Sequence, residues 1–555
     1  MSFPYMAFPS PSRLRLLGLS FLFPALVSAQ TTPPAASAPA TPPAAVTAPQ
    51  WHLLDPEQDG GVMGISARRA YTELLQGKAS TPVLVAVIDA GIDTAHVDLK
   101  RVLWHNRKEI AGNGQDDDKN GYADDVLGWS FLGGPDGRNI NVETLEETRL
   151  MAKLQPLYAG KVRTAVPAAK RAEFDLYQKV KKSYDAKVKE NGQRLKEFSQ
   201  AYTENAQGAE GLKQALGVSR LDTATLRNPP TQDPQLRQIT RGLYTSLQQA
   251  GFASLDDVLE EMKRGLKETQ DQLEYGLNLK YNPRPIVGDQ PEDTKQRNYG
   301  NRDVHGPDPM HGTHVAGIIG ADRENSLGVL GVAANVQIMA VRAVPDGDER
   351  DKDVANAIRY AVDNGAQIIN MSFGKYYSPQ RPAVEEAIKY AATKNVLLVH
   401  SAGNENADLD KTLQYPAPVY QNGQRIPNMI TVGASARTND ENLVADFSNY
   451  GKTQVDVFAP GNQIYATLPG SRYGNLSGTS MAAPVVAGMA AVLKSYYPQL
   501  TAVQLKRIIL DSAVPYHTKV RKPGSTTLVD FAELSRTGGL VNLYRALQLA
   551  QQPTP

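Results

Sequence analysis

The segment VLVAVIDAG, residues 83–91, carries the clearest signal for the fold. Residues 83–88 are apolar and mostly β-branched, which is typical of a parallel strand that is buried on both faces. The run ends in Asp89, Ala90 and Gly91, an acidic residue followed by a turn. We therefore expect a buried strand that places a carboxylate at its carboxyl end.

Further strand-like and helical segments follow in alternation. Strand patterns occur at residues 336–341, 368–371, 396–399 and 429–432, with helical patterns at 354–364 and 383–393 between them. Strands that alternate with helices predict an α/β fold built on a doubly wound, mostly parallel sheet. Sheets of this kind bind their substrates at the carboxyl ends of the strands.

One long region, residues 145–279, interrupts this alternation. Apolar residues such as Val180 and Tyr184 recur there at helical spacing among many Lys, Arg and Glu residues. Ser254 and Asp257 are placed like the N-cap and third residue of a helix. We expect a mainly α-helical insertion, broken near residues 228–230, that acts as a spacer or stabilising segment; the alternative is a lid or a partner-binding arm.

Composition excludes several functional classes. The 555 residues have a formal net charge of +1, so no global basic field favours nucleic acid or an anionic membrane as partner. The chain has no cysteine, which excludes disulfides, a thiol nucleophile and thiolate metal ligands.

The N-terminus has the pattern of a secretory signal peptide. Arg13 and Arg15 precede an apolar run at residues 16–26, and small residues follow as far as Ala29. A membrane anchor is the alternative, but about 20 apolar residues are needed to span a bilayer and Pro24 interrupts this run. We expect cleavage after Ala29 and a secreted or periplasmic protein without a membrane span.

The chain therefore divides into four parts in the sequence. A Pro-, Ala- and Thr-rich stretch after the signal peptide cannot bury a core and is expected to be a linker. The expected parts are a signal peptide at residues 1–29, a linker at 30–50, an α/β domain at 51–144 and 280–550, and the helical insertion at 145–279.

Four short motifs contain the residues for acyl-transfer chemistry. Hydrolysis of a peptide bond requires a nucleophile, a base, a carboxylate that orients the base, and donors for the oxyanion. A serine that begins a helix lies at the positive end of the helix dipole, where an oxyanion is stabilised. The motifs are Asp89 at the strand end, HGTHVAG at residues 311–317, SAGN at 401–404 and GTSMAAP at 478–484.

These motifs, in the order Asp, His, Asn, Ser, resemble those of the subtilases, the subtilisin-like serine peptidases. The resemblance covers roughly residues 50–140 and 280–550. It implies a subtilisin-type sheet and an endopeptidase that acts on protein or peptide substrates, with no cofactor needed for the chemistry. By the same resemblance, Asp89, His311 and Ser480 form the catalytic triad, and the side-chain amide of Asn404 stabilises the oxyanion.

Other residues near these motifs compete for the roles of acid and base. Asp93 lies beyond the turn at Gly91 and is expected to support that turn. His314 is expected to pack or to bond the backbone, and a metalloprotease motif is excluded because no Glu follows His311 in the His-Glu-x-x-His manner. The spacing of 222 positions from Asp89 to His311 exceeds that of compact subtilases, which the helical insertion explains.

Two stretches are candidates for binding the substrate backbone. By resemblance, the stretch after the strand at 368–371 pairs with the residues before the scissile bond, and the stretch before Asn404 lines the opposite wall. Ordinary core packing is an equal alternative for Phe373. The candidate substrate-binding residues are Ser372, Phe373, Gly374, Ser401, Ala402 and Gly403.

An acidic stretch, DDDKNGYADD at residues 116–125, is a candidate calcium loop. Oxygen-bearing side chains alternate around Gly121, as at the start of an EF-hand loop, but Leu127 stands where the bidentate Glu is expected. A solvated acidic turn is the alternative. The candidate ligands of a structural calcium ion are Asp116, Asp118, Asn120, Tyr122 and Asp124.

Two other functions remain open at this point. One is an extracellular binding protein built on an inactive peptidase core, with the helical insertion as its working surface. The other is a processing peptidase whose insertion recognises one partner.

Overall fold

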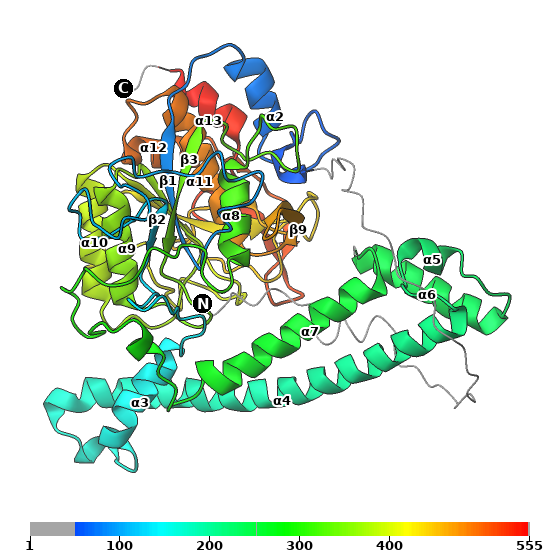
Figure 1. Ribbon diagram of the computed structural model, residues 1–555, viewed down its shortest axis with the longest axis horizontal. Coiled ribbons are helices and arrows are strands. Elements are labelled where there is room, and N and C mark those ends of the chain that lie inside the picture. The colour runs from blue at the N-terminus through cyan, green and yellow to red at the C-terminus, as the bar shows by residue number, and fades with distance from the viewer. Residues whose placement is uncertain (1–49, 251, 553–555) are drawn as a thin grey trace. The chain divides into compact units, whose positions relative to one another are not determined.

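The computed structural model describes residues 50–250 and 252–552 (Figure 1). The expected signal peptide, most of the linker and the last residues lie outside this range. The described chain forms two compact units, one containing residues 50–149 and 280–552, here called the sheet unit, and one containing residues 150–279, here called the arm. In the described part of the chain, no helix combines the length and hydropathy needed to cross a membrane.

The sheet unit is built on a nine-stranded sheet in the order β10-β13-β7-β6-β5-β4-β1-β3-β2. Every pairing is parallel except that of β10 with β13 at one edge, so the predicted α/β fold with a mostly parallel sheet is confirmed. The strands are β1 (Val83–Asp89), β2 (Gly128–Ser130), β3 (Val336–Arg342), β4 (Ile368–Met371), β5 (Leu397–Ser401), β6 (Met429–Ser435), β7 (Val457–Pro460), β10 (Val514–Pro515) and β13 (Gly539–Leu540).

Two antiparallel hairpins lie outside this sheet. They are formed by β8 (Ile464–Leu468) with β9 (Arg472–Leu476), and by β11 (Lys519–Arg521) with β12 (Leu528–Asp530).

Helices cover both faces of the sheet, which explains why β1 has no polar face. Val85 and Val87 belong to the core on one side, with α8, α11, α12 and α13, whereas Ala86 and Ile88 belong to the core on the other side, with α9 and α10. The helices are α8 (Met310–Gly320), α9 (Asp351–Asp363), α10 (Arg381–Thr393), α11 (Thr479–Tyr496), α12 (Ala502–Asp511) and α13 (Leu543–Ala550).

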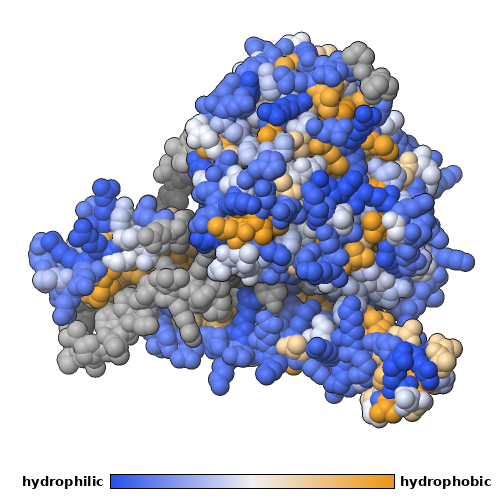
Figure 2. Space-filling model, turned by 180° about the vertical axis from the view of Figure 1, so that it is seen from behind, coloured by the Kyte–Doolittle hydropathy of each residue, from blue (hydrophilic) through white to orange (hydrophobic). Residues whose placement is uncertain are grey.

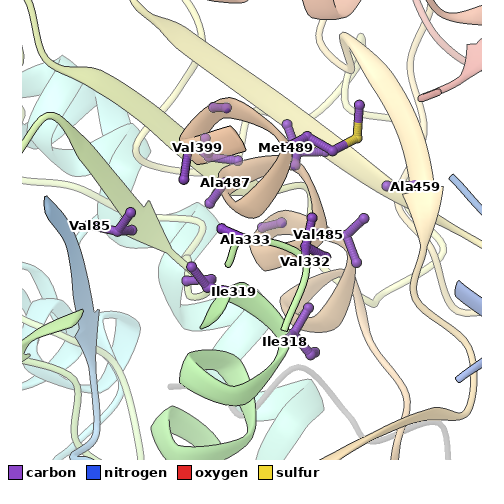
Figure 3. Packing of buried hydrophobic residues seen from close by; sticks show 14 of the residues in the cluster. Val85, Ile318, Ile319, Val332, Ala333, Val399, Ala459, Val485, Ala487 and Met489 are labelled. Carbon is purple, nitrogen blue, oxygen red and sulfur yellow. The ribbon is translucent and has the colours of Figure 1, made fainter. Parts of the chain in front are cut away.

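Helix α11 is buried along almost its whole length, from Thr479 to Ser495. Small side chains allow this close packing: a Cβ on Gly488 would lie 2.6 Å from Cβ of Val332. Figure 3 shows the same core from close by, with side chains of α11 meeting those of β1, α8 and the 332–333 loop.

Short helical turns complete the sheet unit. The first described residues, including Trp51, are buried in the core beside α11. These turns are η1 (Trp51–Leu53), α2 (Ala67–Arg69), η2 (Ala70–Leu75), η6 (Arg284–Ile286) and η7 (Phe531–Glu533).

The arm is made of helices in its described residues. The long helix α4 packs against α7, and α5 and α6 join these two helices around a separate small core that includes Leu212 and Met262 (Figure 1). Ser254 caps α7 by accepting from the N–H of Asp257, as its spacing predicts. The elements are α3 (Glu146–Tyr158), which begins in the sheet unit, then η3 (Arg163–Ala165), η4 (Ala168–Lys170), α4 (Arg171–Leu216), α5 (Thr223–Arg227), α6 (Pro234–Ala250), α7 (Leu255–Asp271) and η5 (Gln272–Gly276).

The visible surface is mostly hydrophilic, with apolar residues in small groups (Figure 2). The most exposed large apolar side chains among the described residues are scattered along the sequence: Ile110, Leu157, Val162, Val188, Leu327, Val503 and Leu528.

Candidate functional site

Each predicted catalytic residue lies at, or just beyond, one end of a secondary-structure element of the sheet unit. Asp89 is the last residue of β1, and Asn404 lies shortly after the end of β5. His311 is the second residue of α8, and Ser480 is the second residue of α11. All four side chains are buried or nearly so.

The structure brings Asp89 and His311 together across the 222-residue separation. Nδ1 of His311 lies 2.8 Å from Oδ1 and 3.0 Å from Oδ2 of Asp89. Gly312 permits this approach, because a Cβ there would lie 2.2 Å from the carbonyl oxygen of Gly91. The carboxylate therefore fixes the orientation of the imidazole and the tautomer with a proton on Nδ1.

Ser480 lies beside the end of β4, the strand that pairs with β1. Its hydroxyl donates to the carbonyl oxygen of Ser372 at 3.1 Å, and the hydroxyl of Ser372 donates back to the carbonyl oxygen of Ser480 at 2.8 Å. Ile88 of β1 pairs with Met371 of β4, so Asp89 and Ser372 leave the sheet at the same edge, on strands about 4.8 Å apart. The pair Asp89–His311 and the hydroxyl of Ser480 thus lie at the carboxyl ends of the neighbouring strands β1 and β4.

Asn404 presents an uncommitted amide donor. Its Oδ1 accepts from both the N–H and the hydroxyl of Thr479, at 2.8 and 2.9 Å, which fixes the orientation of the side chain. Its Nδ2 is buried and has no hydrogen-bond partner among the described residues. That nitrogen lies 3.3 Å from the position that a Cβ on Gly478 would take, two residues before Ser480. A buried donor held in place without an acceptor is what an oxyanion site requires.

Two supporting residues were missed from the sequence. The hydroxyl of Thr479 also accepts from the N–H of Gly403 at 3.0 Å, so it holds the loop that carries Asn404. Asn449 holds the same loop: it donates to the carbonyl oxygen of Ala402 and accepts from the N–H of Glu405. Thr479 lies inside the GTSMAAP motif and could have been found, whereas nothing near Asn449 in the sequence marks it.

The rival candidates have other partners. Burial lowers the pKa of His314 to about 3, and its Nε2 lies 3.2 Å from the carbonyl oxygen of Gly474. His96, a histidine that follows the Asp89 motif in the sequence, has its Nε2 at 3.1 Å from the carbonyl oxygen of Arg472. The carboxylate of Asp93 accepts from the N–H groups of Ala95 and Gly470 and so supports a turn, as predicted.

The two candidate substrate-binding stretches follow adjacent parallel strands, β4 and β5. The side chain of Phe373 is 1% exposed and belongs to the core, so only its backbone is available for a substrate. Between the stretches lies Gln414, a third residue missed from the sequence: Cβ atoms on Gly374 and Gly403 would lie within 2.9 and 2.4 Å of its side chain.

The acidic loop gathers a cluster that differs from the predicted one. Ligand atoms of Glu109, Asp116 and Asp118 lie within 4.8 Å of one another, and Glu109 was not among the predicted residues. Three carboxylates suit Ca²⁺ in ligand type. Several of their oxygens also accept backbone N–H groups, as Asp116 does from Asn120 and Gly121.

The predicted ligand Asp124 does not join this cluster. Its carboxylate accepts from the N–H groups of Gly112 and Gly114 at 2.7 and 2.9 Å and pairs with Arg302. Asn120 is also engaged locally, since its Oδ1 accepts from the N–H of Tyr122. The alternating spacing of the motif predicted a single set of ligands. In the structure, Asp116 and Asp118 lie in the cluster with Glu109, whereas the carboxylate of Asp124 binds the turn at residues 112–114.

Comparison with known proteins adds independent information. The model of the subtilase family matches residues 80–538. A thermophilic serine proteinase of Bacillus sp. (strain AK1) is 45% identical over 193 residues, which cover 34% of this chain and 44% of that protein. Subtilisin BL of Lederbergia lenta is 39% identical over 205 residues, 37% of this chain and 70% of that protein. Subtilisin E of Bacillus subtilis (strain 168) is 39% identical over 208 residues, 37% of this chain and 51% of that protein. The chain thus spans about half the length of two of these relatives.

Proposed function

Because the chain belongs to the subtilase family, we propose that it is a serine endopeptidase with Ser480 as nucleophile, His311 as general base and Asp89 as the carboxylate that orients it. The observation that carries the proposal is the contact of 2.8 Å between Nδ1 of His311 and Asp89, formed at the strand edge where Ser480 lies. Asn404, with its uncommitted buried amide, is the oxyanion donor.

The first step forms an acyl-enzyme. Nε2 of His311 takes the hydroxyl proton of Ser480 as Oγ attacks the scissile carbonyl carbon. The oxyanion accepts from Nδ2 of Asn404 and from the N–H of Ser480 at the start of α11, where helix N–H groups have no intrahelical acceptor. Asp89 stabilises the imidazolium, which then donates its proton to the leaving amine.

The second step releases the acyl group. Water replaces the amine, His311 takes a proton from it, and the hydroxide attacks the ester carbonyl. The oxyanion again faces Asn404, and collapse of the tetrahedral intermediate returns the proton to Oγ of Ser480. No other group is needed to balance the reaction, which is consistent with chemistry that requires no cofactor.

The setting of this activity is extracytoplasmic. The signal-peptide pattern at residues 1–29 supports export to the medium or the periplasm, and a net charge of +1 gives no support for a nucleic-acid partner. The substrates are proteins or peptides. The charged helices of the arm supply a surface for a partner in addition to the substrate.

Structural calcium is a further part of the proposal. Glu109, Asp116 and Asp118 would hold the ion and lock the loop, without a part in the chemistry. Added Ca²⁺ should raise the midpoint of thermal unfolding of the sheet unit, and Asp118→Asn should remove this rise while Asp308→Asn, at an exposed site, should not. An equal rise in the Asp118→Asn protein would refute the site.

The test of the peptidase assignment is Ser480→Ala. The variant should lose casein hydrolysis by about 10⁴-fold or more and should not be labelled by a fluorophosphonate. Ser199→Ala, at an exposed position of α4, is the matched control and should keep both properties. If the wild-type chain is not labelled and does not hydrolyse casein, a binding protein on an inactive peptidase core becomes the better proposal.

A further inference from the structure

The loop between α3 and α4 exposes apolar side chains at one end of the arm. This end, residues 153–171, is here called the tip. Leu157 is 49% exposed and Val162 is 63% exposed, so the tip holds two of the most exposed large apolar side chains among the described residues. Figure 2 shows apolar residues gathered at this end of the arm. Smaller exposed apolar residues lie beside them: Pro156, Ala159, Ala165, Pro167, Ala168 and Ala169. Apolar residues that gather on a surface are typical of an interaction site.

All charged residues of the tip are basic. Residues 153–171 contain no Asp or Glu and five basic residues: Lys153, Lys161, Arg163, Lys170 and Arg171. The first acidic residues that follow, Glu173 and Asp175, form exposed ion pairs with Lys170 and Arg163. Because exposed ion pairs contribute little free energy, these pairs do not prevent the cations from binding another anion.

The basic charge is confined to one half of the arm. Residues 150–200 contain twelve Lys and Arg residues and five Asp and Glu residues, whereas residues 201–279 contain eight and eleven. The two halves therefore have opposite net charge, although the net charge of the whole chain is only +1. The 46 residues of α4 span about 70 Å between the tip and the small core of the arm. The tip is thus the end of the arm that attracts anions.

Aromatic packing beneath the tip keeps its apolar residues outside. The ring of Tyr158 packs edge-on against that of Phe174, with 5.6 Å between the ring centroids, and both side chains are buried. The hydroxyl of Tyr158 donates to Oε1 of Glu173 at 2.5 Å, which ties the end of α3 to the first turn of α4. Because aromatic rings already occupy the interior at this end of the arm, Leu157 and Val162 remain on the surface.

A lipid surface fits this combination of residues. A protein segment that binds at a membrane interface buries apolar side chains among the headgroups, while its Lys and Arg residues bind anionic lipids. In the tip, Lys161, Val162 and Arg163 are consecutive, so both kinds of contact come from the same exposed loop. An acidic protein would pair with the cations but would place carboxylates beside Leu157 and Val162.

We propose that the tip binds the surface of an anionic lipid bilayer and so attaches the protein to a membrane from outside, without a membrane span. This inference does not depend on the proposed catalytic residues, because every residue that carries it lies in the arm. It gives the arm a function as an attachment device in addition to its part as a charged helical insertion.

The experiment measures co-sedimentation of the full-length mature protein with lipid vesicles. The vesicles consist of phosphatidylcholine alone or of an equimolar mixture of phosphatidylcholine and phosphatidylglycerol. The protein should bind the anionic mixture about tenfold or more tightly than phosphatidylcholine alone, because only the mixture attracts the basic residues. Raising the salt concentration to about 1 M should weaken binding to the mixture, since salt screens this attraction.

Two double variants test the two kinds of contact separately. Leu157→Ser with Val162→Ser removes the exposed apolar side chains, and Lys161→Gln with Arg163→Gln removes two of the basic residues. Each should weaken binding to the anionic vesicles by about tenfold or more. Because all four side chains are exposed, the circular-dichroism spectrum and labelling by a fluorophosphonate should stay as in the wild type.

Matched controls change the same residue types elsewhere. Val503→Ser with Leu528→Ser alters two side chains of the sheet unit that are 51% and 52% exposed. Lys263→Gln with Arg227→Gln removes two exposed cations from the other half of the arm. Both control proteins should bind the anionic vesicles as the wild type does.

Three results would overturn the inference: a wild type that does not bind the anionic vesicles, tip variants that bind as well as the wild type, or controls that lose as much binding as the tip variants. Retention of the wild type on immobilised polyglutamic acid without binding to vesicles would indicate an acidic protein as the partner and would also overturn it. A wild type that binds the anionic vesicles through the tip but is not labelled by the fluorophosphonate would refute the proposed function alone.

Discussion

The sheet unit and the arm hold their charged residues in opposite ways. In the sheet unit, the side chain of Arg284 is 3% exposed and pairs with those of Asp289 and Asp353, which are fully buried. In the arm, Lys181 and Asp185 pair one helical turn apart and are about half exposed. The difference teaches which unit depends on specific side-chain partners: breaking a buried ion pair leaves an uncompensated charge, whereas an exposed pair is replaced by water.

The two units also differ in how their helices are buried. Helix α11 is rich in small residues and is buried on all sides. In α4 the buried residues lie along one stripe, and many of the other residues are charged. A helix of the first kind is stable only inside a completed core, and a helix of the second kind needs one partner. The three tryptophans, Trp51, Trp104 and Trp129, all lie in the sheet unit, so their fluorescence reports that unit separately.

The largest effect is expected from Arg284→Ala. The substitution leaves the carboxylate of Asp353 buried without its cation, while Asp289 keeps its ion pair with Lys352, and it should lower the free energy of unfolding of the sheet unit by about 3–5 kcal/mol. Urea denaturation followed by tryptophan fluorescence measures this loss. If the loss of unfolding free energy is no larger than that caused by breaking an exposed ion pair, the two units do not differ in their dependence on ion pairs.

The next effect is expected from Leu212→Ala in the small core of the arm. Leu212 is 1% exposed, and the cavity should cost about 2–4 kcal/mol. Because the arm has its own core, an early transition should appear in far-ultraviolet circular dichroism while the tryptophan transition keeps its midpoint. If both transitions shift together, the arm and the sheet unit unfold as one.

Acid should weaken the sheet unit before the arm. Burial lowers the pKa of His52 and His314 to about 3 and that of His400 to about 4, whereas residues 150–279 contain no histidine. Since the unfolded chain binds these protons near pH 6.5 and the folded chain does not, stability is full above pH 6.5 and falls towards pH 4.

The slope of this loss gives the test. Each such histidine should contribute up to about 1.4 kcal/mol per pH unit. His314→Gln, which keeps a donor for the carbonyl oxygen of Gly474, should make the slope shallower, and His517→Gln, at a site 77% exposed, should not. An unchanged slope in the His314→Gln protein would show that this histidine is not held neutral.

The smallest effect is expected from Lys181→Ala. The ion pair with Asp185 is exposed on both sides, so water and salt replace it. The midpoint of the circular-dichroism transition should stay within experimental error of the wild-type value. A clear shift of the midpoint would mean that exposed ion pairs contribute to the stability of the arm.

The fold and the arrangement of the site were predictable where local pattern and tertiary role coincide. The apolar run at 83–88 has no polar face because both faces of β1 are covered, and a carboxylate after such a run lies at the sheet edge. The motifs at Asp89 and His311 each mark the end of an element, so their contact could be predicted despite their distance in the sequence. Strands such as β2 and β13 are too short to produce a pattern.

The missed residues act through contacts that only the folded chain creates. Gln414 reaches Gly374 and Gly403 because β4 and β5 bring the two glycines together. Glu109 joins the acidic cluster from outside the motif. Asp124 fits the alternating spacing of a calcium loop, but its carboxylate is bound by a backbone N–H group and by Arg302. The spacing of the motif does not reveal these partners.

The position of Ser480 at the first turn of α11 ties reactivity to the integrity of the interior. Because α11 is buried along almost its whole length, Ser480 cannot move unless the helix moves within the core. Covalent labelling of Ser480 should therefore report whether the whole sheet unit is folded. The extent of labelling should decrease together with the tryptophan signal as the protein is denatured.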